Sequence, residues 1–457
     1  MNKKYVYFIG TIAALAGLLF GIDLGVVAGI QPYLKSEWGL STSQIELSIS
    51  SILIGAVVGA IISGPLNRIF GRKSLLAFSA LIFVIGSLGS AFANSYEALV
   101  YIRIFLGLAL GIATFTAPLY LSEIAPKEVR GMMVSTYQLM ITIGIVVAYI
   151  SDLYFIHLNN INIISNAATW RWMLGVVAIP SIFMLFIVLY IPRSPRWVAI
   201  KGNYAGALKI LQKLYLTDAA NKEMKTIKET INSSGKISSL LKNKKFLGVL
   251  VLGIGLQLIQ QFSGMNAILY YAPTMFTSAG FNHTGAMQIT ILIGTVNVLS
   301  TLIAVRFIDI IGRKKLLQIG SCILIISTML LAVLFNNHME TYQAILAIIL
   351  IFLFIFGFAI SYGPVIWTLC AEIFPIQGRE LGITCSTAAN WIGNTLVASY
   401  SLTIMHSIGT NMFYLMLMCF AMISFLVFKY LIPETNRITL EEIEQKFWEK
   451  STPLETA

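Results

Sequence analysis

Polar side chains crowd one apolar stretch of the chain, residues 257–273, which belongs to a run long enough to cross a bilayer. Gln257 and Gln261 fall on one helix face, and Asn266 and Tyr270 form a second pair one turn apart. An amide side chain is costly in hydrocarbon unless it finds a partner or faces water. The stretch therefore predicts a ligand cavity; the alternative is that these amides only bond neighbouring helices together.

The dipeptide Ser263-Gly264 lies between the two pairs. On an unbroken helix the side chains of Gln261 and Asn266 would diverge by about 140°. Local unwinding at Ser263-Gly264 would let both point at one ligand. We therefore expect a helix break at this dipeptide.

An acid in the first apolar run is the second candidate for chemistry. Gly17, Gly21, Gly25 and Gly29 recur every four residues, a spacing typical of close helix packing. Asp23 lies about 200° round the helix from Gly21, so we expect it to point away from that packing face. A carboxylate at this depth must pair, bind a proton or meet water.

Arg103 is the nearest candidate for a buried cation in the same half of the chain, on one helix face with Gly107 and Gly111. If Asp23 and Arg103 pair, protonation of the acid breaks a charge pair and biases a two-state element. A static ion pair is the alternative.

The composition places these residues in a membrane. The chain has 457 residues, of which 57% are hydrophobic and 11% charged, and its mean hydropathy is +0.81. Repeated apolar runs of at least about 18 residues indicate an all-α polytopic membrane protein. We predict twelve transmembrane helices, at about 6–30, 45–66, 74–93, 98–121, 132–152, 171–191, 247–273, 285–308, 315–335, 342–371, 380–404 and 411–432.

The net charge of +11 follows from membrane topology and does not indicate a nucleic-acid partner. With both termini cytoplasmic, nearly all lysines and arginines fall on the cytoplasmic side, as the positive-inside rule requires. The four cysteines lie in or beside predicted spans, at spacings that suit neither a metal site nor a disulfide framework. No cofactor, no metal and no cleavable signal sequence are expected, and no feature specific to a dimer stands out, so we expect a functional monomer.

The chain repeats itself at a period of roughly 245 residues. Gly71-Arg72-Lys73 recurs as Gly312-Arg313-Lys314, and Glu123-Ile124-Ala125-Pro126 recurs as Glu372-Ile373-Phe374-Pro375. Two six-helix halves are typical of a transporter that rocks around a midplane site. The predicted parts are an N-terminal bundle at 1–192, a cytoplasmic linker at 193–245, a C-terminal bundle at 246–433 and a tail at 434–457. We expect short amphipathic helices in the linker; disorder is the alternative.

These motifs, together with Arg103-Ile-Phe-Leu-Gly-Leu, Gln260-Gln261-Phe-Ser-Gly-Met-Asn266 and Pro433-Glu434-Thr435, occur in the order found in a known family. Over essentially its whole length the chain resembles the sugar porters of the major facilitator superfamily, and within them the bacterial galactose–proton and arabinose–proton symporters. The resemblance implies the major facilitator fold and a multi-pass location in the bacterial cell (inner) membrane. It also implies that the protein binds a monosaccharide and a proton, besides contacting the lipid bilayer.

The resemblance also implies residues of a sugar site. Amides suit a sugar because hydroxyls both donate and accept hydrogen bonds, and an indole ring suits its C–H face. For the two tryptophans an interfacial anchor is the alternative. Phe20 and Tyr271 are expected as walls, and the other positions that match the family's sugar site are Gln138, Gln260, Gln261, Asn266, Asn297, Trp367, Asn390 and Trp391. The family likewise associates an acid at Asp23 with proton symport and its absence with facilitators.

Charged residues at cytoplasmic helix ends are expected to pair across the two halves when the inner gate is closed. This set is Arg72, Glu123, Arg130, Arg313, Glu372 and Arg379. The chain departs from the family at three positions. Asn67 stands where an aspartate is usual, Arg193 where an acid is usual, and Arg437 where a glycine is usual. These departures leave open which residues of this set pair with each other. Ile145 stands where a xylose-transporting relative has glutamine, which argues against xylose.

We therefore expect a sugar–proton symporter that works by alternating access, of galactose/glucose or arabinose type. An uncoupled facilitator would not need the acid at Asp23. A non-transporting receptor usually has a longer cytoplasmic tail than this chain. A membrane enzyme would need a nucleophile, metal or phosphate motif that the sequence does not contain. A drug exporter explains an apolar cavity and not one rich in amides.

Overall fold

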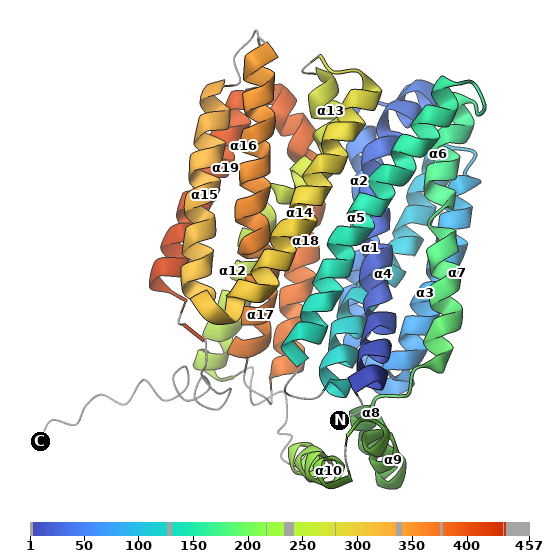
Figure 1. Ribbon diagram of the computed structural model, residues 1–457, viewed down its shortest axis with the longest axis vertical. Coiled ribbons are helices and arrows are strands. Elements are labelled where there is room, and N and C mark those ends of the chain that lie inside the picture. The colour runs from blue at the N-terminus through green and yellow to red at the C-terminus, as the bar shows by residue number, and fades with distance from the viewer. Residues whose placement is uncertain are drawn as a thin grey trace, which may run out of the picture. The chain divides into compact units, whose positions relative to one another are not determined.

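The computed structural model describes residues 3–125, 130–215, 217–232, 242–278, 280–334, 341–374, 378–432 and 434–435, and these form helices and loops without a strand (Figure 1). The helices are α1 (Lys3–Trp38), α2 (Thr42–Phe70), α3 (Arg72–Ala91), α4 (Tyr96–Ile124), α5 (Arg130–Asn160), α6 (Asn166–Gly175), α7 (Ala178–Ile187), the 3-10 helix η1 (Val188–Tyr190), α8 (Pro195–Ile200), α9 (Tyr204–Leu214), α10 (Thr217–Asn232), α12 (Lys244–Phe262), α13 (Met265–Ser278), α14 (His283–Ile311), α15 (Arg313–Leu334), α16 (Thr341–Ile360), α17 (Tyr362–Ile373), α18 (Arg379–Ile408) and α19 (Thr410–Tyr430).

The predicted membrane-spanning character is confirmed. Within the described ranges, 11 segments are helical, long and apolar enough to cross a membrane, and each coincides with a predicted span. The remaining predicted span, 380–404, coincides with α18, which is not among the 11. α18 is less apolar because it carries Asn390, Asn394 and several serines and threonines.

The predicted break at Ser263-Gly264 is also confirmed. α12 ends at Phe262 and α13 begins at Met265, and Gly264 has a φ of +88°. A side chain at this φ is strained, and a Cβ at Gly264 would meet the Leu417 side chain. A second predicted span is divided in the same way, because α16 ends at Ile360 and α17 begins at Tyr362.

The chain forms two compact units. Unit 1 comprises Met1–Ser233, Asn266–Leu299 and Asn394–Ile408, and unit 2 comprises Ser234–Met265, Ser300–Gly393 and Gly409–Ala457. The chain therefore changes unit within apolar helical segments as well as in loops. The predicted division at 192, 245 and 433 stays a prediction.

In unit 1, α1 packs along α5 through its glycine stripe. A Cβ at Gly17, Gly21 or Gly25 would collide with the α5 backbone or with Ala148, so the two helices approach as closely as glycine allows. α2 packs on α4 in the same manner, with Gly55 against Gly107. These close pairs fix α1 and α4, which carry Asp23 and Arg103.

The linker helices α8, α9 and α10 form a small apolar cluster of their own and lie beside the N-terminal end of α1 (Figure 1). Its members are small and aliphatic residues from one face of each helix: Val198, Ala199, Ala207, Leu211, Ala220, Met224 and Ile227. Short amphipathic helices are therefore present over 195–232, and residues 233–241 lie outside the described residues.

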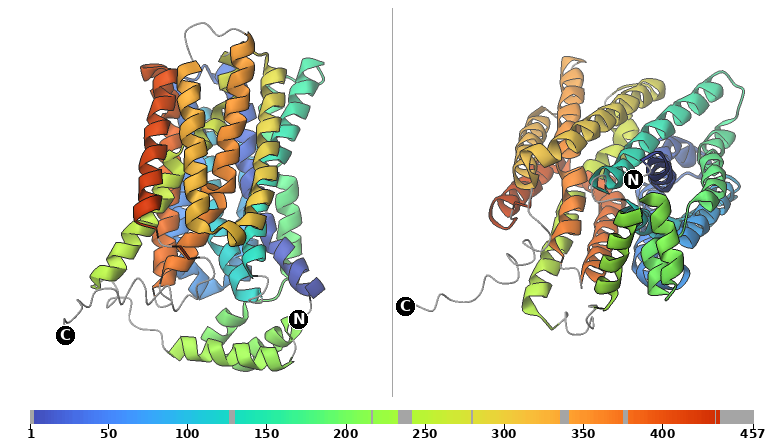
Figure 2. Two further views of the ribbon diagram at one scale, coloured as in Figure 1. Left: turned by 60° about the vertical axis from the view of Figure 1, so that its left-hand side comes forward. Right: turned by 60° about the horizontal axis from the view of Figure 1, so that its bottom comes forward.

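In unit 2, α15 packs against α16 and α19, and α12 packs against α17 (Figure 2). Gly320 of α15 is in close contact with Ser361, at the break between α16 and α17. This arrangement holds the start of α17 beside α12, which carries the glutamines of the predicted sugar site.

Candidate substrate and coupling sites

Three amides of unit 2 form a hydrogen-bonded cluster. Asn390 Nδ2 of α18 donates to Gln257 Oε1 at 2.6 Å and to Gln260 Oε1 at 2.8 Å, both on α12. Gln260 Nε2 donates in turn to the carbonyl oxygens of Tyr362 and Gly363, at 2.7 Å and 3.2 Å. The three side chains are buried, so each hydrogen bond replaces contact with water. The cluster holds α12, α17 and α18 together and fixes where its amides point.

The other predicted sugar-site residues of unit 2 lie on the same three helices. Gln261 is buried and its Cβ lies close to Gly393 of α18. Trp391 is buried beside Asn390, and Trp367 of α17 is half-buried. Gln260 and Asn390 thus belong to one bonded cluster, whereas Gln261, Trp367 and Trp391 are neighbours on its helices.

Unit 1 holds the remaining predicted sugar-site residues. Asn266 and Tyr271 are on α13, Asn297 on α14, Gln138 on α5 and Phe20 on α1. Tyr271 and Asn297 are buried, and the other three are half-buried. The Tyr271 hydroxyl donates to the carbonyl oxygen of Ala398, which fits a fixed wall. That the two sets line one cavity stays a prediction.

Asp23 and Arg103 meet in the interior of unit 1. Asp23 Oδ2 lies 3.6 Å from Arg103 Nη2, with side-chain exposures of 4% and 0%. Among the described residues, none of the three guanidinium nitrogens of Arg103 makes a hydrogen bond. The pair is therefore a long ion pair in which no hydrogen bond joins the two groups, and the attraction between them is that of their charges alone.

A small, mostly apolar cavity opens beside Asp23. Its lining includes Phe20 of α1, Ile52 of α2, Leu110 of α4 and Tyr270 of α13, together with Asp23 itself. The Tyr270 hydroxyl donates to Asn394 Oδ1 of α18 at 3.1 Å. Residues from α13, the helix of the predicted sugar site, therefore lie against the surroundings of the predicted proton site.

The contacts of α13 with α1 and α5 involve residues that sequence reasoning missed. Gln31 Nε2 of α1 donates to the carbonyl oxygen of Tyr270 at 2.6 Å, and Thr274 Oγ1 donates to Gln31 Oε1 at 3.1 Å. On α5, the Tyr149 hydroxyl donates to the carbonyl oxygen of Leu269 at 2.9 Å. Side chains from two helices thus hold the backbone of α13, and no motif marks them.

A buried acid on α2 makes a comparable contact with α18. Glu46 accepts hydrogen bonds from the Thr403 backbone N–H at 2.9 Å and from the Thr403 hydroxyl at 2.5 Å. The sequence does hold a signal for this residue, because an acid inside a predicted span needs a partner. It does not say which partner.

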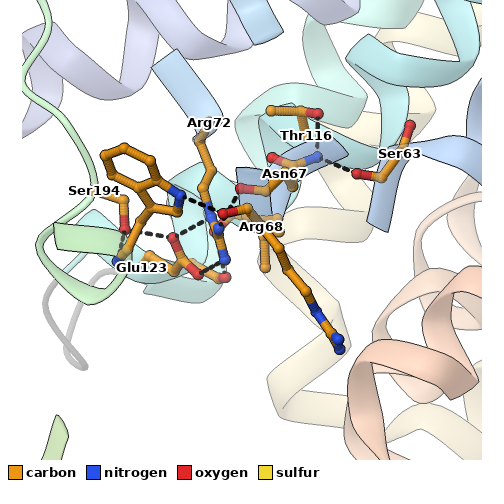
Figure 3. A network of polar contacts seen from close by, with 10 residues as sticks. Ser63, Asn67, Arg68, Arg72, Thr116, Glu123 and Ser194 are labelled. Atoms are coloured by element: carbon orange, nitrogen blue, oxygen red, sulfur yellow. Dashed lines mark hydrogen bonds and ion pairs between the residues drawn. The ribbon is translucent and has the colours of Figure 1, made fainter. Parts of the chain in front are cut away.

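Arg72 and Glu123, two of the predicted gate residues, belong to the first gate cluster, which we define as Arg72, Glu123 and Ser194 of unit 1 (Figure 3). Arg72 Nε lies 2.9 Å from Glu123 Oε2 and Arg72 Nη2 lies 2.7 Å from Glu123 Oε1, which is bidentate pairing. Ser194 Oγ also donates to Glu123 Oε2, at 2.5 Å. The cluster ties α3 and α4 to the start of α8.

A second gate cluster repeats this plan. We define it as Arg313, Glu372, Glu434 and Thr435 of unit 2. Arg313 Nη2 lies 3.1 Å from Glu372 Oε1, and the Thr435 hydroxyl donates to Glu372 Oε2 at 2.7 Å, as Ser194 does to Glu123. Glu434 adds two further contacts by accepting the backbone N–H groups of Arg313 and Lys314, at 2.9 Å and 3.1 Å. Glu434 thus caps the N-terminus of α15.

Arg72, Glu123, Arg313 and Glu372 accordingly form ion pairs within each unit, and pairing across the two halves stays a prediction. Arg379 is half-buried at the start of α18. The side chain of Arg130, and Arg437 as a whole, lie outside the described residues.

The departures at Asn67 and Arg193 have structural consequences. Asn67 Nδ2 donates to the Ser63 carbonyl oxygen and to Thr116 Oγ1, both at 2.9 Å, so the amide serves as a donor that an aspartate cannot be (Figure 3). Arg193 follows Ile191-Pro192 in the sequence as Glu434 follows Ile432-Pro433, so the two occupy matching positions of the repeat. The Arg193 guanidinium lies 5.6 Å from the centre of the Trp197 ring.

Comparison with known proteins gives a consistent result. The chain is 43% identical over 448 residues to the galactose-proton symporter of Escherichia coli (strain K12), covering 97% of this chain and 95% of that protein. It is 41% identical over 456 residues to the arabinose-proton symporter of the same strain, and this match covers 97% of this chain and 94% of that protein.

A solved structure has the same fold. The proton:xylose symporter XylE of the major facilitator superfamily, bound to 6-bromo-6-deoxy-D-glucose, matches with a TM-score of 0.86 and 29% identity, covering 98% of this chain and all of that one (100%). The predicted major facilitator fold is therefore confirmed. The family model described as "Sugar (and other) transporter" matches residues 9–447. The chain belongs to this sugar transporter family.

Proposed function

We propose that the protein is a proton-coupled monosaccharide importer of the bacterial cell membrane, which works as a monomer by alternating access and carries galactose, glucose or arabinose. The observation that supports it most directly is the buried Asp23–Arg103 pair beside a cavity that also touches α13. The two relatives named above as galactose-proton and arabinose-proton symporters, each covered almost entirely, support the same substrate class.

The amides of α12 and α18 are suited to bind the sugar. Gln260 and Asn390 are already oriented by hydrogen bonds to each other and to α17, so little side-chain entropy is lost when a ligand binds. Amides both donate to and accept from hydroxyl groups, and the indole of Trp367 offers a face for the sugar's C–H groups. Asn266 on α13 would complete the ring of amides when it faces the same ligand.

Asp23 is suited to carry the proton. While Asp23 is ionised, it compensates the buried charge of Arg103, whose side chain is 0% exposed. When a proton neutralises Asp23, Arg103 is left as a buried, unpaired charge, which costs about 3–5 kcal/mol. Because about 1.4 kcal/mol changes an equilibrium tenfold, this is enough to shift a two-state equilibrium by at least a hundredfold.

The experiment is sugar uptake into proteoliposomes with an imposed proton gradient, with the wild type beside Asp23→Asn and Glu97→Gln. Glu97 is an exposed acid at the start of α4, the helix that carries Arg103, and serves as the matched control. The sugars are galactose, glucose, arabinose and xylose, and external pH is recorded. The wild type and Glu97→Gln should accumulate sugar and alkalinise the medium, whereas Asp23→Asn should lose accumulation and keep sugar exchange.

Each contrary outcome removes a different part of the proposal. If the wild type only equilibrates sugar and Asp23→Asn behaves identically, the protein is a facilitator and Asp23 is structural. If sugar binds and none is carried, the protein is a receptor. If xylose is the preferred sugar, the proposed substrate range is wrong.

A further inference from the structure

Asp152 is a buried acid that the proposed coupling does not use. It lies on α5 near the end of the glycine stripe, where a Cβ at Gly29 of α1 would overlap its carboxyl group. The side chain is 0% exposed; the backbone N–H of Gly29 faces its carboxyl group, and among the described residues no side chain donates a hydrogen bond to either carboxyl oxygen. In the same unit, buried Asp23 has Arg103 and buried Glu46 has the two donors of Thr403.

Among the described residues, no positively charged side chain compensates an ionised Asp152, and the Gly29 backbone N–H is a neutral donor. The titratable groups within electrostatic reach are the phenols of Tyr33 on α1 and Tyr149 on α5. Arg171 of α6, which also packs on α1, is paired with Glu37 at 3.0 Å. Within the described ranges no lysine or arginine forms an ion pair with Asp152. An isolated buried carboxylate costs several kcal/mol, whereas the protonated acid does not carry this cost.

The burial of Asp152 is linked to the packing of α13. Tyr149, one turn before Asp152 on α5, donates to the carbonyl oxygen of Leu269, and Gln31, two residues after Gly29 on α1, donates to that of Tyr270. α13 therefore lies against both helices close to the carboxyl group. If these contacts open, water can reach this part of the α1–α5 interface and stabilise the ionised acid.

We propose that Asp152 is a second proton-binding residue of the transport cycle, and that its protonation favours the arrangement in which α13 packs on α1 and α5. By linkage, the packing of α13 and proton binding at Asp152 then favour each other to the same extent. Asp152 acts on the conformational equilibrium rather than on the sugar. This inference extends the proposed proton coupling and does not require Asp23 to be the coupling acid.

The first test is the pH dependence of sugar exchange in an Asp23→Asn background, where the first acid cannot titrate. One proton changes an equilibrium by at most about tenfold per pH unit. Exchange by Asp23→Asn should fall towards alkaline pH with a slope up to that limit, and Asp23→Asn with Asp152→Asn should be nearly independent of pH. Ser151→Ala is the matched control, because it removes a neighbouring buried polar atom without a hydrogen bond and should keep the slope.

The second test needs no transport. Infrared spectra of the purified protein report the carbonyl stretch of protonated carboxylic acids. With Asp23→Asn as the background, so that Asp23 cannot contribute, a band should be present in Asp23→Asn and after adding Ser151→Ala, and absent after adding Asp152→Asn or Asp152→Ser. Unchanged spectra in both Asp152 variants, or an equal pH slope of exchange with and without Asp152, overturn the inference. If Asp23→Asn exchanges no sugar, the proposed coupling fails, and the infrared comparison still decides the protonation of Asp152.

Discussion

Replacing Glu123 by glutamine should destabilise the protein more than the equivalent change at Glu372. The two residues occupy matching positions in the repeat, so each substitution is the control for the other. Glu123 makes bidentate contacts of 2.7 Å and 2.9 Å with Arg72, and the two side chains are 4% and 8% exposed. Glu372 makes a 3.1 Å contact with Arg313, and these side chains are 20% and 10% exposed.

The difference follows from what each substitution leaves behind. Glu123→Gln leaves Arg72 as a buried charge without its carboxylate, and breaking such a pair costs about 3–5 kcal/mol. After Glu372→Gln the hydroxyl of Thr435 can still donate to the amide oxygen, and Glu434 still holds the N-terminus of α15. Arg313 is about as buried as Arg72, but its partner Glu372 is 20% exposed, so we expect a smaller loss at Glu372 than at Glu123.

The assay is thermal unfolding of the purified protein in detergent, with a double-mutant cycle on Arg72→Gln and Glu123→Gln. The double variant should recover much of the loss, because no uncompensated charge remains. Equal destabilisation by Glu123→Gln and Glu372→Gln, or a double variant that simply adds the two single losses, would refute this reasoning.

Three further predictions concern single residues. Arg193→Glu should raise the free energy of unfolding by about 0.5–1 kcal/mol, measured by thermal unfolding. The new carboxylate would cap a helix N-terminus as Glu434 does in the other repeat. Arg193→Gln should give a smaller gain. Gly264→Ala should cost at least about 1–2 kcal/mol and weaken sugar binding measured by calorimetry, because φ is +88°, whereas Gly255→Ala, with open space around it, should be neutral. Asn390→Ala should lower sugar affinity at least about tenfold and cost about 1–3 kcal/mol, because two buried amide oxygens lose their donor.

The features that the sequence predicted correctly are those set by local spacing. The glycine stripe on α1 required a close neighbour, and the structure supplies α5. Asp23 lies off that stripe and meets Arg103, as the helical period indicated. The break at Ser263-Gly264 followed from side chains that a straight helix would have pointed apart.

The features that could not be predicted depend on which helices contact each other, and on which residues along each helix form the contact. Glu46 and Thr403 are 357 residues apart in the chain, and nothing in the local pattern of either names the other. Asp152 coincided with the expected end of the span 132–152, a position where an acid would ordinarily be solvated. α5 instead continues to Asn160, which puts the acid inside the unit.

α13 carries residues of both the proposed sugar site and the cavity beside the proposed proton site. It begins directly after the break at Gly264, and the chain passes from unit 2 to unit 1 between Met265 and Asn266. It carries Asn266 of the proposed sugar site and Tyr270 of the cavity beside Asp23. If the proposed sugar site includes Asn266, a sugar that draws Asn266 towards itself moves a helix whose next turn lines the surroundings of Asp23. On the proposed function, sugar binding and proton binding would then be coupled because both act on the position of this short helix.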